Sequence, residues 1–153
     1  SVKGDPEGRA QMALGQYIAG MGFSNVGLGI VHSMAHPLSA VYDIPHGVAC
    51  AILLTPVLKF NAPSTADKYR DIAVAMGVKN TEDMSIEQAR QACIEAVEKL
   101  SVDVGIPQEL TQLGVKEEDL QFLSESAFVD ACTPGNPRDV SVEAIKEIYK
   151  SIM

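Results

Sequence analysis

The spacing of apolar residues along the chain predicts helices almost from its first residues. Asp5, Pro6 and Glu7 supply in order a cap, a first-turn proline and an early acid, which is a typical helix start. Apolar side chains then recur every three or four positions. Gly20 and Gly22 follow this stretch, so we expect the first helix to end there.

A second helix is expected from Ser24 or Asn25, either of which could cap it, to Tyr42. Its side chains are apolar on nearly every side, which is typical of a buried helix. Pro37 has no amide hydrogen and cannot bond to the carbonyl one turn before it. We therefore expect a kink or a break near His36.

Five further helices are expected from the same periodicity, at residues 46–60, 64–76, 85–104, 116–127 and 141–152. Ser64 with Asp67 forms a capping-box pattern at the start of one of them. Ser85 with Gln88 forms the same pattern at the start of another. No strand pair and no repeat stands out, so the sequence predicts a single all-α domain, a bundle of about seven helices over residues 1–153.

Composition narrows the choice of partners. The chain has 153 residues, 46% of them hydrophobic, enough to bury a core in one domain. Its net charge of −8 argues against nucleic acid and anionic membrane surfaces, which both need a basic face. The longest apolar run, residues 47–58, is too short to cross a bilayer and predicts a buried helix instead.

The cysteines indicate a reducing compartment. Cys50, Cys93 and Cys132 form no CxxC pair and leave one residue over, so a disulfide framework is not expected. We therefore expect a cytoplasmic protein. Cys50 and Cys93 lie on apolar helix faces and are expected to be inert residues of the core.

All three histidines fall within fifteen positions of one another. His32 and His36 are four apart and so share a helix face, and a tight turn can bring His46 back against His32. Neutral imidazole is a common metal ligand, but a buried histidine is also often a satisfied core residue. Spacing alone leaves both interpretations open. Asp43 is the nearest carboxylate, and it fits a helix cap equally well.

Residues 27–47 read GLGIVHSMAHPLSAVYDIPHG, and this run resembles the signature of the iron-containing alcohol dehydrogenases. The resemblance is strongest to the lactaldehyde reductase (propanediol oxidoreductase) group of that family. It continues through residues 51–56, 68–73, 104–107 and 136–138 and covers essentially the whole chain.

The resemblance implies the all-helical, metal-binding C-terminal domain of such an enzyme, a dehydroquinate synthase-like C-terminal domain. The NAD(P)-binding α/β domain would be a separate N-terminal partner, outside this chain. No glycine-rich dinucleotide or phosphate-binding loop occurs here, which agrees with a nucleotide held mainly elsewhere. The parent is expected to be a homodimer or a higher oligomer.

In the family a divalent metal takes one Asp and three His ligands, two of which correspond to His32 and His46. The other two would lie upstream of this chain. Fe²⁺ is the expected ion, with Zn²⁺ as an alternative. His36 corresponds to a histidine beside the metal and near the nicotinamide, where it would serve as a catalytic proton relay and contact the cofactor.

Two further residues correspond to family positions near the substrate. Phe23 would line the substrate channel, although a core residue at a helix junction is an equally good explanation. Cys132 lies in a segment that would approach the metal pocket, and an ordinary buried thiol is the alternative.

The implied reaction is metal-assisted hydride transfer between a small alcohol or aldehyde and the nicotinamide cofactor. The chain by itself would be inactive, because two ligands and the nucleotide-binding fold are missing. Two alternatives stay open. One is a free-standing, non-catalytic helical module for metal binding or dimerisation, and the other is a zinc enzyme of the glycerol dehydrogenase type.

Overall fold

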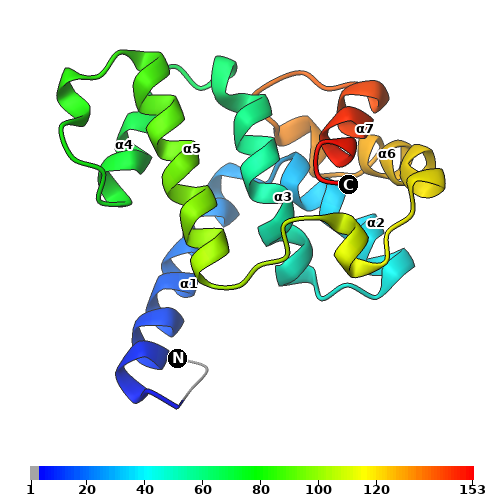
Figure 1. Cartoon of the computed structure of the whole chain (residues 1–153), viewed down its shortest axis with the longest axis horizontal. Helices are drawn as coiled ribbons and strands as arrows, with labels where there is room; N and C mark the ends of the chain where they lie inside the picture. The colour runs from blue at the N-terminus through cyan, green and yellow to red at the C-terminus, as the bar shows by residue number, and fades with distance from the viewer. Residues whose placement is uncertain (1–3) are drawn as a thin grey trace.

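The computed structural model describes residues 4–153, which form seven α-helices joined by turns and short 3₁₀ helices, with no strand among them (Figure 1). The all-α prediction of about seven helices is therefore confirmed. The helices are α1 (Pro6–Val26), α2 (Ile30–Tyr42), α3 (His46–Asn61), α4 (Lys68–Ala75), α5 (Ile86–Asp103), α6 (Leu120–Phe128) and α7 (Val142–Lys150).

Four helices share the main core. α2 packs against α3 and α6, and α6 packs against α7. Leu38, Leu53 and Ile145 are fully buried where these helices meet. α4 and α5 pack on each other around Tyr69 and Cys93, which form a smaller second core. Figure 1 shows this second unit beside α3.

One segment within the described residues, His46–Ser64, is long and apolar enough to cross a membrane when judged by length and composition alone. Core helices of soluble proteins meet the same requirements. This segment contains α3, and Leu53 and Val57 of α3 are buried in the main core.

The first helix is longer than predicted. α1 continues through Gly20 and Gly22 to Val26 and ends where Gly27 adopts a left-handed φ of 82°. The predicted end at the two earlier glycines is therefore wrong. A glycine costs a helix only about 1 kcal/mol relative to alanine, which does not stop a helix favoured on both sides.

The start of the second helix also differs from the prediction. Ser24 and Asn25 lie inside α1 and do not cap α2, which begins only at Ile30. Of the kink or break expected near His36, a break is wrong, because α2 runs through Pro37 without interruption. The φ of proline suits a helix, although Pro37 removes one backbone hydrogen bond from α2.

α1 stands apart from the rest of the fold. Figure 1 shows it leading away from the other helices toward the N-terminus. None of its residues is buried, and its large apolar side chains are between 45 and 82% exposed. These are Met12, Leu14, Tyr17, Ile18, Met21, Phe23 and Val26. α1 therefore presents an apolar surface that no other described residue covers.

The two predicted capping boxes have opposite outcomes. Ser85 and Gln88 form the box at the start of α5, as predicted. Ser64 instead lies in a 3₁₀ turn, and α4 starts only after Asp67, without a side-chain cap. Ala66, between them, has a left-handed φ of 46°, which prevents a helix from running through this point.

Candidate metal centre

The three histidines come together where α2 and α3 pack as a hairpin. The ring centroids of His32 and His46 are 5.5 Å apart, as are those of His36 and His46. The His36 and His46 rings are nearly parallel, with an interplanar angle of 17°. The structure thus brings His46 back against His32, as the tight turn between the helices predicts.

The start of α2, which carries His32, is held by a segment from far along the chain. Asn136 and Asn61 form a reciprocal amide pair with distances of 2.8 and 2.9 Å. The Asn136 Oδ1 also accepts a hydrogen bond from the Ile30 backbone N–H. A Cβ at Gly29 would come within 3.1 Å of the same oxygen, so the two backbones meet closely here. The first turn of α2, and His32 with it, is fixed by this contact.

His46 is the first residue of α3, and Cys50 follows one turn later on the same face. The Cys50 Sγ is 3.5 Å from the His46 Nε2. The potential ligand atoms of His32, His46 and Cys50 all lie within 4.8 Å of one another. The expectation that Cys50 is only a core residue is incomplete: it packs against the core but is half-buried beside the histidines. The spacing of four residues between His46 and Cys50 was the sequence feature that could have predicted their contact.

His36 has a carboxylate partner that the sequence did not reveal. The Asp130 Oδ2 lies 2.8 Å from the His36 Nδ1, although 94 positions separate the two residues. The backbone N–H of Cys132 donates to the other carboxylate oxygen, Oδ1, at 2.8 Å. The potential ligand atoms of His36, Asp130 and Cys132 also lie within 4.8 Å of one another.

Asp43, the carboxylate that the sequence offered, is not part of this group. It is exposed at the end of α2 in a left-handed conformation, with φ 54°, which fits the alternative of a helix cap. The signal for Asp130 was its position two residues before Cys132, in the segment already expected near the pocket.

Electrostatics at the centre favours the neutral form of His32. Burial lowers the pKa of His32, and the neighbouring His46 and His36 lower it further. For Asp130, burial acts to raise the pKa, but hydrogen bonds from the Cys132 backbone and from His36 outweigh it, so the pKa is lowered overall. Burial and then the nearby Asp130 raise the pKa of the Cys132 thiol. At neutral pH the group therefore combines a neutral His32, an anionic Asp130 and an uncharged Cys132.

Phe23 lies in the last turn of α1, not at a break between helices, and its ring is 6.3 Å from the His32 ring. Cys132 lies beside His36, as described. The structure therefore gathers the five candidate site residues, namely Phe23, His32, His36, His46 and Cys132, around one centre.

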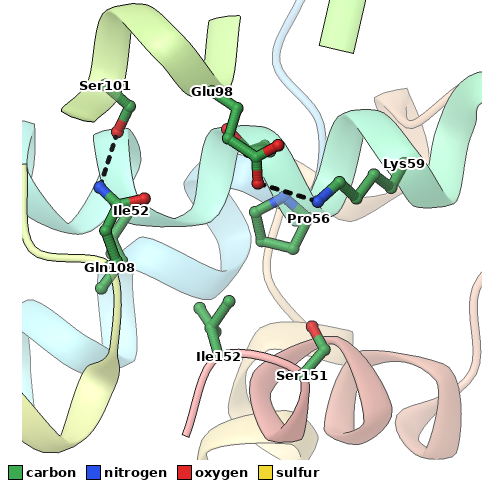
Figure 2. A pocket seen from close by; sticks show the side chains of 9 residues that line it. Ile52, Pro56, Lys59, Glu98, Ser101, Gln108, Ser151 and Ile152 are labelled. Carbon is green, nitrogen blue, oxygen red and sulfur yellow. Dashed lines mark hydrogen bonds and ion pairs between the residues drawn. The ribbon is translucent and has the colours of Figure 1, made fainter. Parts of the chain in front are cut away.

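Two cavities reach the histidines of this centre. One of about 440 Å³ reaches His32 from the start of α2, and one of about 250 Å³ between α2 and α6 is lined in part by His36 and Asp130. A third, of about 400 Å³, lies among α3, α5 and the C-terminal residues (Figure 2). It contains the ion pair of Lys59 and Glu98 at 3.1 Å and none of the five residues singled out in the sequence.

Residues 2–153 match the family described as "Fe-containing alcohol dehydrogenase family, C-terminal". The chain belongs to the Fe-containing alcohol dehydrogenase family. It is 58% identical over 149 residues to lactaldehyde reductase of Escherichia coli K12, covering 97% of this chain and 39% of that protein. It is 44% identical over 142 residues to 1,3-propanediol dehydrogenase of Citrobacter freundii, covering 93% and 36%. The chain thus spans under two fifths of the length of these dehydrogenases.

Solved structures of the same family share the fold. A crystal structure of 1,3-propanediol oxidoreductase superposes with a TM-score of 0.85 at 43% identity, over 88% of this chain and 35% of that one. An alcohol dehydrogenase from Oenococcus oeni gives a TM-score of 0.84 at 39% identity, with the same coverage of both chains. The family and the fold that the resemblance implied are confirmed.

Proposed function

We propose that this chain is the metal-binding half of an NAD(P)-dependent oxidoreductase that interconverts primary alcohols or diols with aldehydes. The observation that carries the proposal is the meeting of His32 and His46, with His36 stacked beside them. The names of the relatives support the chemical class. They include an NAD-dependent methanol dehydrogenase of Bacillus methanolicus and an NADPH-dependent butanol dehydrogenase of Clostridium saccharobutylicum, both 38% identical.

The donor set fits a divalent cation such as Fe²⁺ or Zn²⁺. Imidazole nitrogens suit both ions, and the ligand atoms of His32 and His46 are close enough to share one after a small adjustment. Burial keeps His32 in the neutral form that binds a metal. Two imidazoles leave coordination positions open, which agrees with further ligands from an upstream domain. A bound cation would supply Lewis acidity at the substrate oxygen.

The remaining residues of the chain would serve the substrate and its proton. His36 is exposed and borders the centre, so it can pass a proton between the substrate hydroxyl and solvent. The Phe23 ring is 6.3 Å from the His32 ring and Cys132 lies beside His36, so both would form part of the substrate wall. The nicotinamide would be held mainly by the N-terminal domain.

The proposal also covers how this chain contacts the rest of the parent protein and how the parent protein assembles. The exposed apolar side of α1 suits contact with another part of a longer protein or with a second subunit. We propose a homodimeric or larger cytoplasmic enzyme, supported for the compartment only by three free cysteines. The chain alone would be inactive.

The proposal is tested by calorimetric titration of this chain with Zn²⁺ and, without oxygen, with Fe²⁺. We expect weak binding that is lost in His46→Ala, because the chain supplies only half of the ligands. Asp43→Asn is the matched control: it changes the carboxylate nearest to His46 in the sequence, which lies outside the centre, and asparagine tolerates the left-handed backbone there. Circular dichroism of each variant confirms that the helices are retained.

Equal binding by the wild type and His46→Ala would refute the assignment of the centre. Tight one-to-one binding would refute the half-site, because the chain would then complete a site by itself. That result would favour the free-standing metal-binding module.

A further inference from the structure

The carboxylate beside His36 is held in one orientation. Each oxygen of Asp130 has its own partner, since Oδ1 accepts from the Cys132 backbone N–H and Oδ2 faces the His36 Nδ1, both at 2.8 Å. The Asp130 side chain is only 19% exposed, whereas that of His36 is 44% exposed. The acid is thus anchored by the backbone and aims its second oxygen at the imidazole.

We propose that Asp130 is a positioning residue that holds His36 in the neutral tautomer with its hydrogen on Nδ1, so that Nε2 exchanges the substrate proton. An ionised carboxylate can only accept hydrogen bonds, so the facing Nδ1 must carry the hydrogen. The lone pair is then left on Nε2. The catalytic role given to His36 rests on the proposed function, but the tautomer of its ring does not.

The surroundings of His36 support a fixed ring. It stacks on His46 with an interplanar angle of 17°, which limits its rotation from one side. The contact with Asp130 limits it from the other. Carboxylate partners of this kind orient an imidazole and stabilise the imidazolium that forms when the ring takes up a proton. Asp130 would in this way hold the His36 ring in place and leave Nε2 free to exchange a proton.

The first experiment reads the tautomer directly from the ¹⁵N shifts of the His36 ring in this chain, with a chelator present and above pH 7. We expect the wild type to carry its hydrogen on Nδ1. Asp130→Asn should reverse this: the amide oxygen satisfies the Cys132 N–H, and the amide NH₂ then faces His36 and requires an acceptor there. Asp130→Ala should release the ring to the Nε2–H form that free histidine favours.

Asp139→Ala is the matched control, because Asp139 is an exposed acid nine positions further along the same segment. It should leave the His36 tautomer as in the wild type. Asp130→Asn, which keeps the shape of the side chain, preserves the test if Asp130→Ala fails to fold. A wild-type hydrogen on Nε2, or no change in any Asp130 variant, would overturn the proposal.

The second experiment measures kinetics in the full-length dehydrogenase. Asp130→Asn should lower kcat about 10–100-fold while metal content and KM stay near the wild-type values. An unchanged kcat alongside a reversed tautomer would overturn the catalytic part of the inference. Complete absence of alcohol oxidation by the wild type would instead refute the proposed function, and the tautomer would still decide whether Asp130 orients His36.

Discussion

The substitution Gly135→Ala tests whether the loop after α6 packs tightly against the residues just before α2. An added Cβ there would overlap the Leu28 carbonyl oxygen, far inside the 3.0 Å that real Cβ contacts respect, and would lie 3.3 Å from the Leu28 carbonyl carbon. Gly135 does not have a left-handed φ, so its backbone would accept alanine. Only the missing space forbids the Cβ. Gly135→Ala should therefore push the loop away from α2.

The loss of stability in Gly135→Ala can be estimated from the residues around Gly135. Overpacking against backbone typically costs about 1–3 kcal/mol. The next residue, Asn136, holds the amide pair with Asn61, and each of its two hydrogen bonds is worth about 0.5–1.5 kcal/mol when weakened or lost. Because the loop can relax in part, we expect Gly135→Ala to reduce the free energy of unfolding by about 2–4 kcal/mol.

Urea unfolding followed by circular dichroism measures this change, provided that the dependence on denaturant stays constant. Gly47→Ala is the control, since a Cβ at that position in α3 meets nothing within 4 Å. It should be neutral or stabilising by up to about 1 kcal/mol. A loss below about 0.5 kcal/mol in Gly135→Ala, the range of ordinary surface changes, would refute a tight seat for the loop.

Two further predictions concern stability. Leu53→Ala should lower the free energy of unfolding by about 2–5 kcal/mol, because the side chain is fully buried. In the same urea assay, Ile18→Lys on exposed α1 should lower it by at most about 0.5 kcal/mol. Equal losses in the two variants would show that α1 packs on the core. In metal-free protein, burial followed by His46 and His36 lowers the pKa of His32, so the unfolded chain binds more protons than the folded one below pH 6.5. The contribution of His32 to the free energy of unfolding is thus complete above pH 6.5 and is lost as the pH falls through the lower folded-state pKa. Urea titrations from pH 7.5 to 5 should show this decline in the wild type and a shallower decline in His32→Gln. An identical slope in both proteins would contradict the prediction.

Helix formation was largely readable from the sequence. Apolar periodicity found all seven helices, and caps such as Ser85 with Gln88 placed several starts correctly. The errors came where a local signal was weak against its surroundings. Gly20 and Gly22 are poor helix residues but not terminators, so α1 ran past them. Ser64 had the right pattern, but the left-handed Ala66 separated it from the helix.

The sequence by itself determined the family, through the run of residues 27–47, and the meeting of three imidazoles. His32, His36 and His46 lie within one hairpin, and the geometry of a hairpin is local. Only the tertiary structure decided which acid meets His36. Asp130 lies 94 positions away, and no local spacing encodes a contact that depends on how α6 packs against α2. The close contact of Gly135 with Leu28 could not be predicted for the same reason. The only sequence feature of such a contact between distant backbones is a glycine, and glycine also occurs for many other reasons.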